Sequence, residues 1–203
     1  PAMQDVTATM RHFKVSGARF DFCQHIFRIT GTHAVKDYIN GLTVESCEMT
    51  GLRAIVRSDD CRLIKPKFVN NTAIASFKSE YSFGAIVVPH AIDVLDANNS
   101  WNYIVNPNHT ATGRLDGISY IHRYTSVDGL TVIGSSPKDL IYGFILTTGA
   151  TNNVKILDSN FSGFGDIENG TSLLRCDMKP TNIKIMGNTI TSKTSRPKNW
   201  IRG

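Results

Sequence analysis

Short apolar segments recur along the chain, and small or polar turn residues separate them. In each segment, apolar residues flank a position that is mostly polar, which is the period-two pattern of a β-strand with one buried face. Seven segments of this kind begin at Phe13/Val15, Leu42/Val44, Cys61/Leu63, Ile92/Val94, Ile118/Tyr120, Val154/Ile156 and Ile183/Ile185. A repeat of roughly 20–35 residues built from short strands is typical of a solenoid.

A second set of apolar segments lies between the first. These segments cover residues 26–28, 55–57, 86–88, 104–106, 145–147, 173–175 and 200–202. Each repeat therefore has at least two strands, and the closest similarity is between every second strand. This favours strands stacked in parallel over an antiparallel sandwich, which needs tight hairpin turns. The pattern predicts an all-β fold, a parallel β-solenoid of about seven coils.

Two outward-facing positions of this repeat are unexpectedly apolar. The fourth position of the first strand should face water, yet it is apolar from the third coil onward. In the second strand a recurring Arg cannot face a narrow core, so the first position, which is apolar in all seven coils, should also face outward. A strand apolar on both faces is covered on both faces. We therefore expect a subunit interface at Ile55, Ile86, Ile104, Ile145, Leu173, Leu95, Ile121 and Leu157. The alternative is that these residues lie at a bend and turn inward.

Composition limits the classes of partner. The chain has 203 residues and 22.4 kDa, enough for one domain with a substantial core. The net charge of +5 is scattered without a Lys/Arg run, so we expect no nucleic-acid partner, whereas an anionic polymer fits the charge. No signal peptide and no membrane-spanning run is visible. We expect no membrane insertion.

The cysteines and histidines predict neither a metal nor a cofactor. None of the four cysteines has CxxC spacing, and the six histidines show no ligand spacing. The cysteines are expected to be small core residues. Residues 1–12 are expected to be a lead-in whose first three residues resemble a cloning remnant. Residues 13–203 are expected to be one β-solenoid domain of a longer chain.

Three stretches carry a resemblance to a known family. Residues 40–51, 153–162 and 182–191 resemble rungs of the right-handed parallel β-helix of the pectin-lyase-like superfamily, and the resemblance covers nearly the whole chain. Bacteriophage tailspikes are the members that best suit the other features. They are homotrimers of side-by-side β-helices that bind or cleave bacterial surface polysaccharide. The resemblance implies a homotrimer located in the virion tail.

The resemblance is specific for fold and weak for activity. The chain has no Gly-His-Gly and no Arg-Ile-Lys element of polygalacturonases, and no carboxylate cluster like that of pectate lyases. Asn188 matches the turn asparagine that stacks into ladders in this superfamily. Most other coils carry Ala, Cys, Pro or Ser at that place, so no continuous asparagine ladder is expected.

We favour a polysaccharide-binding tailspike or tail-fibre domain that recognises, and in one version depolymerises, a bacterial surface glycan. Two alternatives stay open. One is a free-standing, secreted polysaccharide lyase or hydrolase. The other is a structural stalk that acts as a rigid spacer.

Long connections indicate where a glycan would bind, because loops on a rigid scaffold usually carry function. The connections of coils three, five and six, at about residues 69–85, 126–144 and 162–172, are long. Candidate glycan-binding residues are Tyr81, Tyr142, Phe164, Glu80 and Asp128.

Candidate catalytic residues are the carboxylates Asp166, Glu168 and Asp139. Glycosidases need two carboxyl groups about 5–5.5 Å or roughly 6.5–9.5 Å apart. Adjacent strands lie about 4.8 Å apart, so carboxylates on neighbouring coils span such distances. Lyase or hydrolase chemistry at these residues is a hypothesis that the spacing permits.

A second candidate patch comprises Arg57, Asp59, Asp60 and Arg62. Paired carboxylates beside arginines suit catalysis or the binding of an anionic sugar. The alternative is a set of surface ion pairs that contribute little to stability.

Overall fold

The structure is a computed structural model that describes residues 9–21, 25–29, 38–51, 54–59, 61–76, 85–104, 120–138, 143–164, 172–192 and 201–202. Within these residues every regular element is a β-strand, and every strand pairing is parallel. The expected all-β, parallel fold is confirmed. The described part of the chain contains no helix that is long and apolar enough to cross a lipid bilayer.

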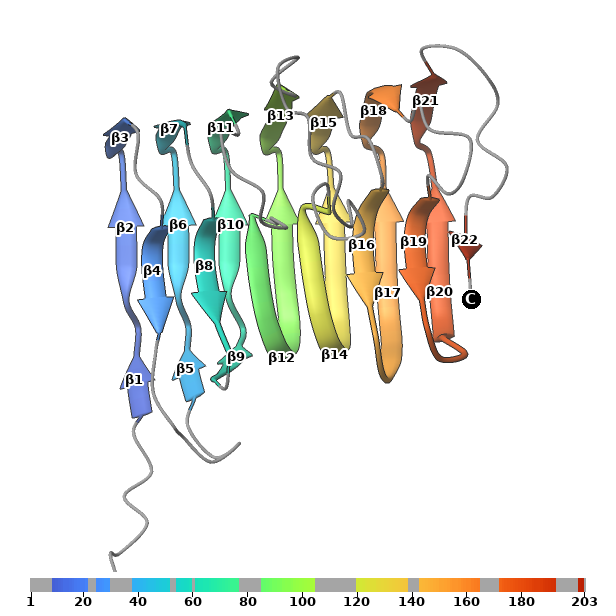
Figure 1. The fold of residues 1–203 in the computed structure, drawn as a ribbon, viewed down its shortest axis with the longest axis horizontal. Helices are drawn as coiled ribbons and strands as arrows, with labels where there is room; N and C mark the ends of the chain where they lie inside the picture. Colours follow the sequence, from blue (N-terminus) through green and yellow to red (C-terminus); the bar gives the residue numbers. More distant parts are fainter. Residues whose placement is uncertain are drawn as a thin grey trace, which may run out of the picture.

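The strands form two sheets (Figure 1). The larger sheet has 15 strands: β1 (Thr9–Arg11), β2 (Lys14–Ser16), β4 (His25–Ile29), β5 (Tyr38–Asn40), β6 (Thr43–Glu45), β8 (Ala54–Ser58), β9 (Arg62–Ile64), β10 (Lys67–Val69), β12 (Ile86–Ala97), β14 (His122–Ile133), β16 (Gly143–Thr147), β17 (Thr151–Leu157), β19 (Ser172–Cys176), β20 (Thr181–Met186) and β22 (Ile201–Arg202). The smaller has seven: β3 (Arg19–Asp21), β7 (Glu48–Thr50), β11 (Thr72–Ser76), β13 (Ser100–Ile104), β15 (Ser136–Lys138), β18 (Asn160–Phe164) and β21 (Thr189–Ser192).

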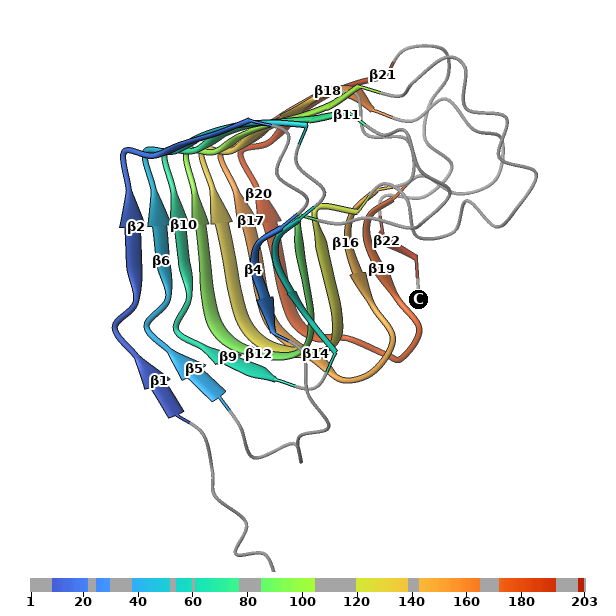
Figure 2. The ribbon, with the colours of Figure 1, turned by 60° about the vertical axis from the view of Figure 1, so that its left-hand side comes forward.

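The chain returns again and again to the same ladders. After β2 it enters β3 of the smaller sheet, then β4 and β5 of the larger sheet, and the next strand, β6, pairs in parallel with β2. The larger sheet curls on itself (Figure 2). One ladder of this sheet runs through residues that are buried or packed on the core: Val15, Val44, Phe68, Asp96, Val132, Ile156 and Ile185.

Three of the first strands lie elsewhere than the sequence pattern predicts. In the third repeat the strand that pairs with β6 is β10, not the segment at Cys61/Leu63, which belongs to β9. In the fourth repeat the ladder passes through Asp96, two residues after the predicted Val94. In the fifth repeat it passes through Val132, twelve residues after the predicted Tyr120. The cause is that β12 is a single strand that pairs with β8, β9 and β10 together. Apolar residues then occur at several offsets within one strand, and period two alone cannot select the register.

The turns on both sides of this ladder share one backbone conformation. In each turn one residue has a positive φ, between 47° and 78°. Before the ladder strand these residues are His12, Gly41, Lys65, Asp93, Gly129, Asn153 and Asn182, and after it Gly17, Ser46, Asn70, Asn98, Gly134, Asp158 and Gly187. Because this region favours Gly, Asn and Asp, it explains the Gly and Asn residues that punctuate the sequence.

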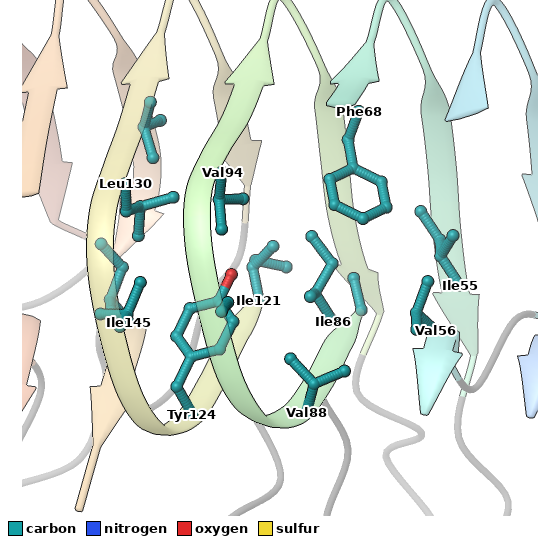
Figure 3. Packing of buried hydrophobic residues seen from close by; sticks show 14 of the residues in the cluster. Ile55, Val56, Phe68, Ile86, Val88, Val94, Ile121, Tyr124, Leu130 and Ile145 are labelled. Carbon is teal, nitrogen blue, oxygen red and sulfur yellow. The ribbon is translucent and has the colours of Figure 1, made fainter. Parts of the chain in front are cut away.

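The predicted subunit interface is largely core. Ile55, Ile86, Ile121, Ile145 and Leu173 are each at most 1% exposed and belong to one hydrophobic cluster. Figure 3 shows the first four among the packed core side chains. The prediction that these residues face a partner subunit is therefore wrong.

The reason is that consecutive residues are buried near the start of these strands. Ile86 and Ile145 occupy the inward ladder that also contains Val56. Leu173 directly precedes that ladder, and at the equivalent place the ring of Phe144 lies edge to face on the ring of Phe161 in β18, with 5.2 Å between the ring centres. Residues at both places thus turn inward, which was the alternative.

Part of the predicted outer column does face outward. Leu95 and Leu157 are half-buried, and Met186 is 57% exposed. Ile133, which was not predicted to belong to this column, pairs with Leu157 and is 36% exposed. Ile104 ends β13 in the smaller sheet and is not in the predicted column; its side chain is outside the description. Cys47, Cys61 and Cys176 are buried, as expected of core residues.

Candidate functional site

Most of the predicted loop residues lie outside the described part of the chain. These are Asp166, Glu168, Asp139, Tyr81, Tyr142, Glu80 and Asp60. Phe164 ends β18, and its side chain is not described. The catalytic and aromatic assignments therefore stay predictions.

The long connections are distributed differently from the prediction. In the fourth repeat residues 105–119 separate β13 from Tyr120, whereas in the fifth only residues 139–142 separate β15 from β16. The prediction had these two lengths reversed because it placed Ile104 in the larger sheet.

A first hollow lies over the strands that carry the recurring arginines. We call it the arginine hollow. It has a volume of about 250 Å³ and is lined by Arg57, Ser58, Asp59, Val87, Val88, Pro89, Arg123, Tyr124, Thr125 and Thr148. Two members of the predicted second patch, Arg57 and Asp59, thus lie in one surface depression.

The parallel register places two arginines on this hollow. Arg57 of β8 pairs with Val87 of β12, which pairs with Arg123 of β14. Nε of Arg57 lies 4.0 Å from Oδ1 of Asp59. That nitrogen is buried and has no hydrogen-bond partner. Because 4.0 Å exceeds hydrogen-bonding distance, Asp59 provides charge to Arg57 but leaves this donor unsatisfied.

A second hollow adjoins the first. We call it the histidine hollow. It has a volume of about 190 Å³ and is lined by Arg62, His90, Ala91, Ile92, Ser126, Val127, Asp128, Ala150 and Asn152. Pro89 and Thr125 line the arginine hollow, and the residues that follow them in the chain, His90 and Ser126, line the histidine hollow. The two depressions therefore meet along β12 and β14, and Arg62 and Asp128 join the candidate site here.

The polar side chains of the histidine hollow are held by hydrogen bonds between rungs. Nδ1 of His90 lies 2.7 Å from Oγ of Ser126 on the paired strand. Asn153 donates from Nδ2 to Oδ1 of Asp128 at 2.6 Å. Thr181 donates from Oγ1 to Oδ1 of Asn152 at 2.6 Å. These bonds fix the donors and acceptors that a polar ligand would meet.

Sequence reasoning missed Arg123, His90, Ser126 and Asn152. A usable signal was present in the turn residues. Aligning the repeats on Lys65, Asp93 and Gly129, rather than on apolar pairs, places Arg62, His90 and Ser126 in one column, each three residues earlier. Arg57 and Arg123 lie eight and six residues before Lys65 and Gly129, so this alignment does not bring them together.

A buried polar cluster lies on the inner side of the same strands. Oδ1 of Asp96 accepts hydrogen bonds from Nδ2 of Asn99 (2.7 Å) and Oγ of Ser135 (2.6 Å). Oδ2 accepts from Nε1 of Trp101 (3.0 Å) and Nε2 of His122 (2.8 Å). All five side chains are at most 1% exposed. Because a ligand cannot reach them, we assign the cluster to stability.

The cluster continues from His122 to Tyr124. The hydroxyl of Tyr124 lies 2.8 Å from Nδ1 of His122. Burial, and to a lesser extent the charge of Asp96, raises the pKa of Tyr124 well above its usual value. Tyr124 therefore keeps its proton at neutral pH, and its hydroxyl is the hydrogen-bond partner of Nδ1 while Asp96 is the partner of Nε2.

A ladder of polar side chains runs through the residues that directly follow the second set of positive-φ residues, those after the ladder strand. Asn71 accepts at Oδ1 from the backbone N–H of Cys47, and Asn99 accepts in the same way from Asn71. The series continues through Ser135, Ser159 and Asn188. The expectation of no continuous ladder is corrected in part. The ladder is unbroken from Cys47 to Asn188, but it mixes Asn with Ser, and the wrong register had put Pro66 and Ala97 in these places.

The chemistry available in the two hollows is hydrogen bonding and charge. Among the described residues no group of three or more His, Cys, Asp or Glu side chains could hold a metal ion. No protein-family model, no curated protein and no solved structure matches this chain. The function is therefore argued from the residues alone.

Proposed function

We propose that this chain is a right-handed parallel β-helix of about seven coils that binds bacterial surface polysaccharide, as a domain of a phage tailspike or tail fibre in the virion tail. The observation that carries the proposal is the pair of adjoining hollows along β12 and β14, lined with arginines, hydroxyls, an amide and carboxylates. The pectin-lyase-like resemblance of the repeats supports the fold.

A rigid ladder suits a polymeric ligand. Parallel strands present side chains at intervals of about 4.8 Å along the stacking direction, and sites on strands hold their geometry better than sites on loops. Arg62, His90 and Ser126 occupy one row of three successive rungs. A glycan chain lying along this row would meet a new set of polar groups at each rung.

The role proposed for the described residues is to bind the polymer, and cleavage is not assigned to them. In the histidine hollow, the amide of Asn152 and the carboxylate of Asp128 already bond to Thr181 and Asn153. They are therefore suited to orienting hydroxyl groups. Depolymerisation through Asp166, Glu168 and Asp139 remains a separate hypothesis.

We also propose a homotrimer whose contact surface is the outward side of the ladder strands. Val69, Ala97, Ile133, Leu157 and Met186 stand on successive rungs there. Ile133 and Met186 are exposed, Val69 and Leu157 are half-buried, and Ala97 is buried. Exposed apolar side chains that lie together are typical of an interaction surface. This row replaces the buried set of residues as the proposed interface.

The test is binding of the purified protein to an array of bacterial capsular and O-antigen polysaccharides, with adsorption to the corresponding cells. The proposal expects a subset of glycans to bind, and Arg62→Ala together with Asn152→Ala to weaken binding at least tenfold. Lys14→Ala, on the distant exposed strand β2, is the matched control. Absence of binding across the array and of adsorption would refute the glycan function and favour the structural stalk.

A further inference from the structure

The hydrogen bond between His90 and Ser126 joins a base to a nucleophile. Nδ1 of His90 lies 2.7 Å from Oγ of Ser126, and the two residues are paired neighbours on β12 and β14. A serine nucleophile and the base that activates it typically lie about 2.6–3.2 Å apart. Both residues are half-buried and line the histidine hollow. A ligand in this hollow can therefore reach a hydroxyl group that already faces a base.

The side of Ser126 away from His90 is lined by a small residue. On that side β14 pairs with β17, where Val127 is the partner of Thr151. Ala150 precedes Thr151, and its carbonyl accepts a hydrogen bond from the N–H of Val127 at 3.0 Å. Ala150 is exposed and belongs to the lining of the hollow. A carbonyl group placed over Ala150 would lie beside the Ser126 hydroxyl, opposite the base.

Asn152 provides a hydrogen-bond donor on the same side. It pairs with Asp128 and lines the hollow. Because Oδ1 of Asn152 accepts from Oγ1 of Thr181 at 2.6 Å, its Nδ2 group points the other way and is the end of the amide that can donate to a ligand. Asp128 and Ser126 are two residues apart and face the same side of the sheet, so the Cα atoms of Asn152 and Ser126 are roughly 8 Å apart. A carbonyl group fits between the two side chains.

The size and the walls of the hollow suit a short acyl group. Its volume of about 190 Å³ lies below the roughly 300–1,000 Å³ of sites for drug-sized ligands. Ile92, which is half-buried, and Ala150 offer apolar surface to a methyl or short alkyl group. The rest of a substrate can extend out of the hollow along the strands, because the arginine hollow adjoins it.

We propose that His90 and Ser126 form a catalytic dyad that hydrolyses an ester of a short-chain carboxylic acid. With the imidazole proton on Nε2, Nδ1 of His90 accepts the hydroxyl proton of Ser126 while Oγ attacks the carbonyl carbon of the ester. Nδ2 of Asn152 donates a hydrogen bond to the oxyanion that forms. The bond between the carbonyl carbon and the alcohol oxygen then breaks. The alcohol leaves with the proton from His90, and the acyl group stays on Oγ.

Water completes the reaction. A water molecule attacks the acyl carbon and gives one proton to Nδ1 of His90, and this proton passes to Oγ as the bond between the acyl carbon and Ser126 breaks. One ester and one water thus yield one alcohol and one carboxylic acid, and the dyad is restored. The reaction removes an acyl group and breaks no glycosidic bond, so it goes beyond the proposed glycan binding.

The experiment uses the intact protein and p-nitrophenyl acetate. Release of p-nitrophenolate gives the rate, and mass spectrometry of the acid-quenched, digested protein locates the acetyl group. We expect acetylation of Ser126, and Ser126→Ala should abolish it. His90→Gln should lower the rate at least about a hundredfold, as expected when a general base is lost. Asn152→Ala should lower it by about a hundredfold, as expected when an oxyanion donor is lost.

Matched controls separate the dyad from the general reactivity of an activated ester. Ser136 and His12 are exposed and do not line the hollow, so Ser136→Ala and His12→Gln should leave the rate unchanged. Urea unfolding checks that each variant is folded, and the wild type unfolded in urea should lose the activity. Acetylation absent from Ser126, or a rate that Ser126→Ala or His90→Gln leaves unchanged, would overturn the inference.

The ester-hydrolysis and glycan-binding proposals fail independently. If polysaccharide binds on the array but Ser126 is not acetylated, the dyad is wrong and the glycan function stands. If Ser126 is acetylated in a manner that requires His90 but no polysaccharide binds, the hollow is an esterase site and the polysaccharide function is wrong.

Discussion

Nε2 of His122 lies 2.8 Å from Oδ2 of Asp96, and both side chains are completely buried. Each replaces an apolar residue in its ladder: Asp96 lies between Phe68 and Val132, and His122 between Ile86 and Ile145. Buried polar groups of this kind are stable only when every partner is present. The contact therefore ties β12 to β14 through the core.

Replacing Asp96 should destabilise the fold strongly. In Asp96→Asn the new amide group must face either Asn99 and Ser135 or Trp101 and His122, and both pairs are donors. We expect a loss of about 3–5 kcal/mol, as for other broken buried pairs, measured by urea unfolding. Asp93→Asn is the matched control on the same strand, because Asp93 is exposed. A loss at Asp96 no larger than at Asp93 would contradict the assignment.

Removal of the Tyr124 hydroxyl should have a smaller effect that depends on pH. Tyr124→Phe leaves Nδ1 of His122 without its hydrogen-bond partner, which costs about 1–3 kcal/mol at neutral pH. The pKa of Tyr124 is raised in the folded protein. Its contribution is therefore fully present below the unfolded pKa, about 10, and is lost as pH rises from there toward the folded pKa.

The wild type should thus lose more stability than Tyr124→Phe between pH 9 and pH 11. Urea unfolding of both proteins across this range is the measurement. The difference between the two free energies of unfolding at each pH reports the titration of Tyr124 alone, because the other tyrosines and the lysines are the same in both proteins. Parallel curves for the two proteins would show that Tyr124 titrates normally.

Gly129 and Lys65 are both positive-φ residues that precede the ladder strand, and substitutions at the two positions should have different effects on stability. Gly129 has φ +78°, and a Cβ there would lie 2.7 Å from Oδ1 and 3.3 Å from Cα of Asp93. Gly129→Ala should cost about 1–2 kcal/mol from backbone strain alone. Lys65 has φ +52° and is exposed, so Lys65→Gly should be neutral or slightly stabilising. Thermal unfolding of the two variants checks the sign.

The proposed assembly predicts a specific sensitivity to charge. Ile133→Lys places a charge in the apolar row and should shift a trimer toward monomer in sedimentation velocity. Thr131→Lys changes the other outward position of the same ladder strand and serves as the control. A wild-type protein that sediments as a monomer would remove the trimer from the proposal.

The alternation and recurrence of apolar residues determined the fold class. Side chains alternate along a strand, and each parallel strand needs a partner, so the repeat alone predicts stacked parallel strands. The same pattern placed Val15, Val44 and Ile156 correctly, because in those repeats the apolar pair coincides with the inward positions of the ladder strand.

Only the tertiary structure determined which residues are neighbours across repeats of unequal length. In β12 and β14 a one-residue slip exchanges inner and outer faces. The sequence pattern did not identify Asp96 as a core residue, and it offered Ile55 and Ile121 as an interface, although both are core. Nor did it show that Arg57, Val87 and Arg123 occupy one ladder position on three successive rungs. Long-range pairing sets that register, because it alone satisfies the backbone hydrogen bonds of each rung while burying one face.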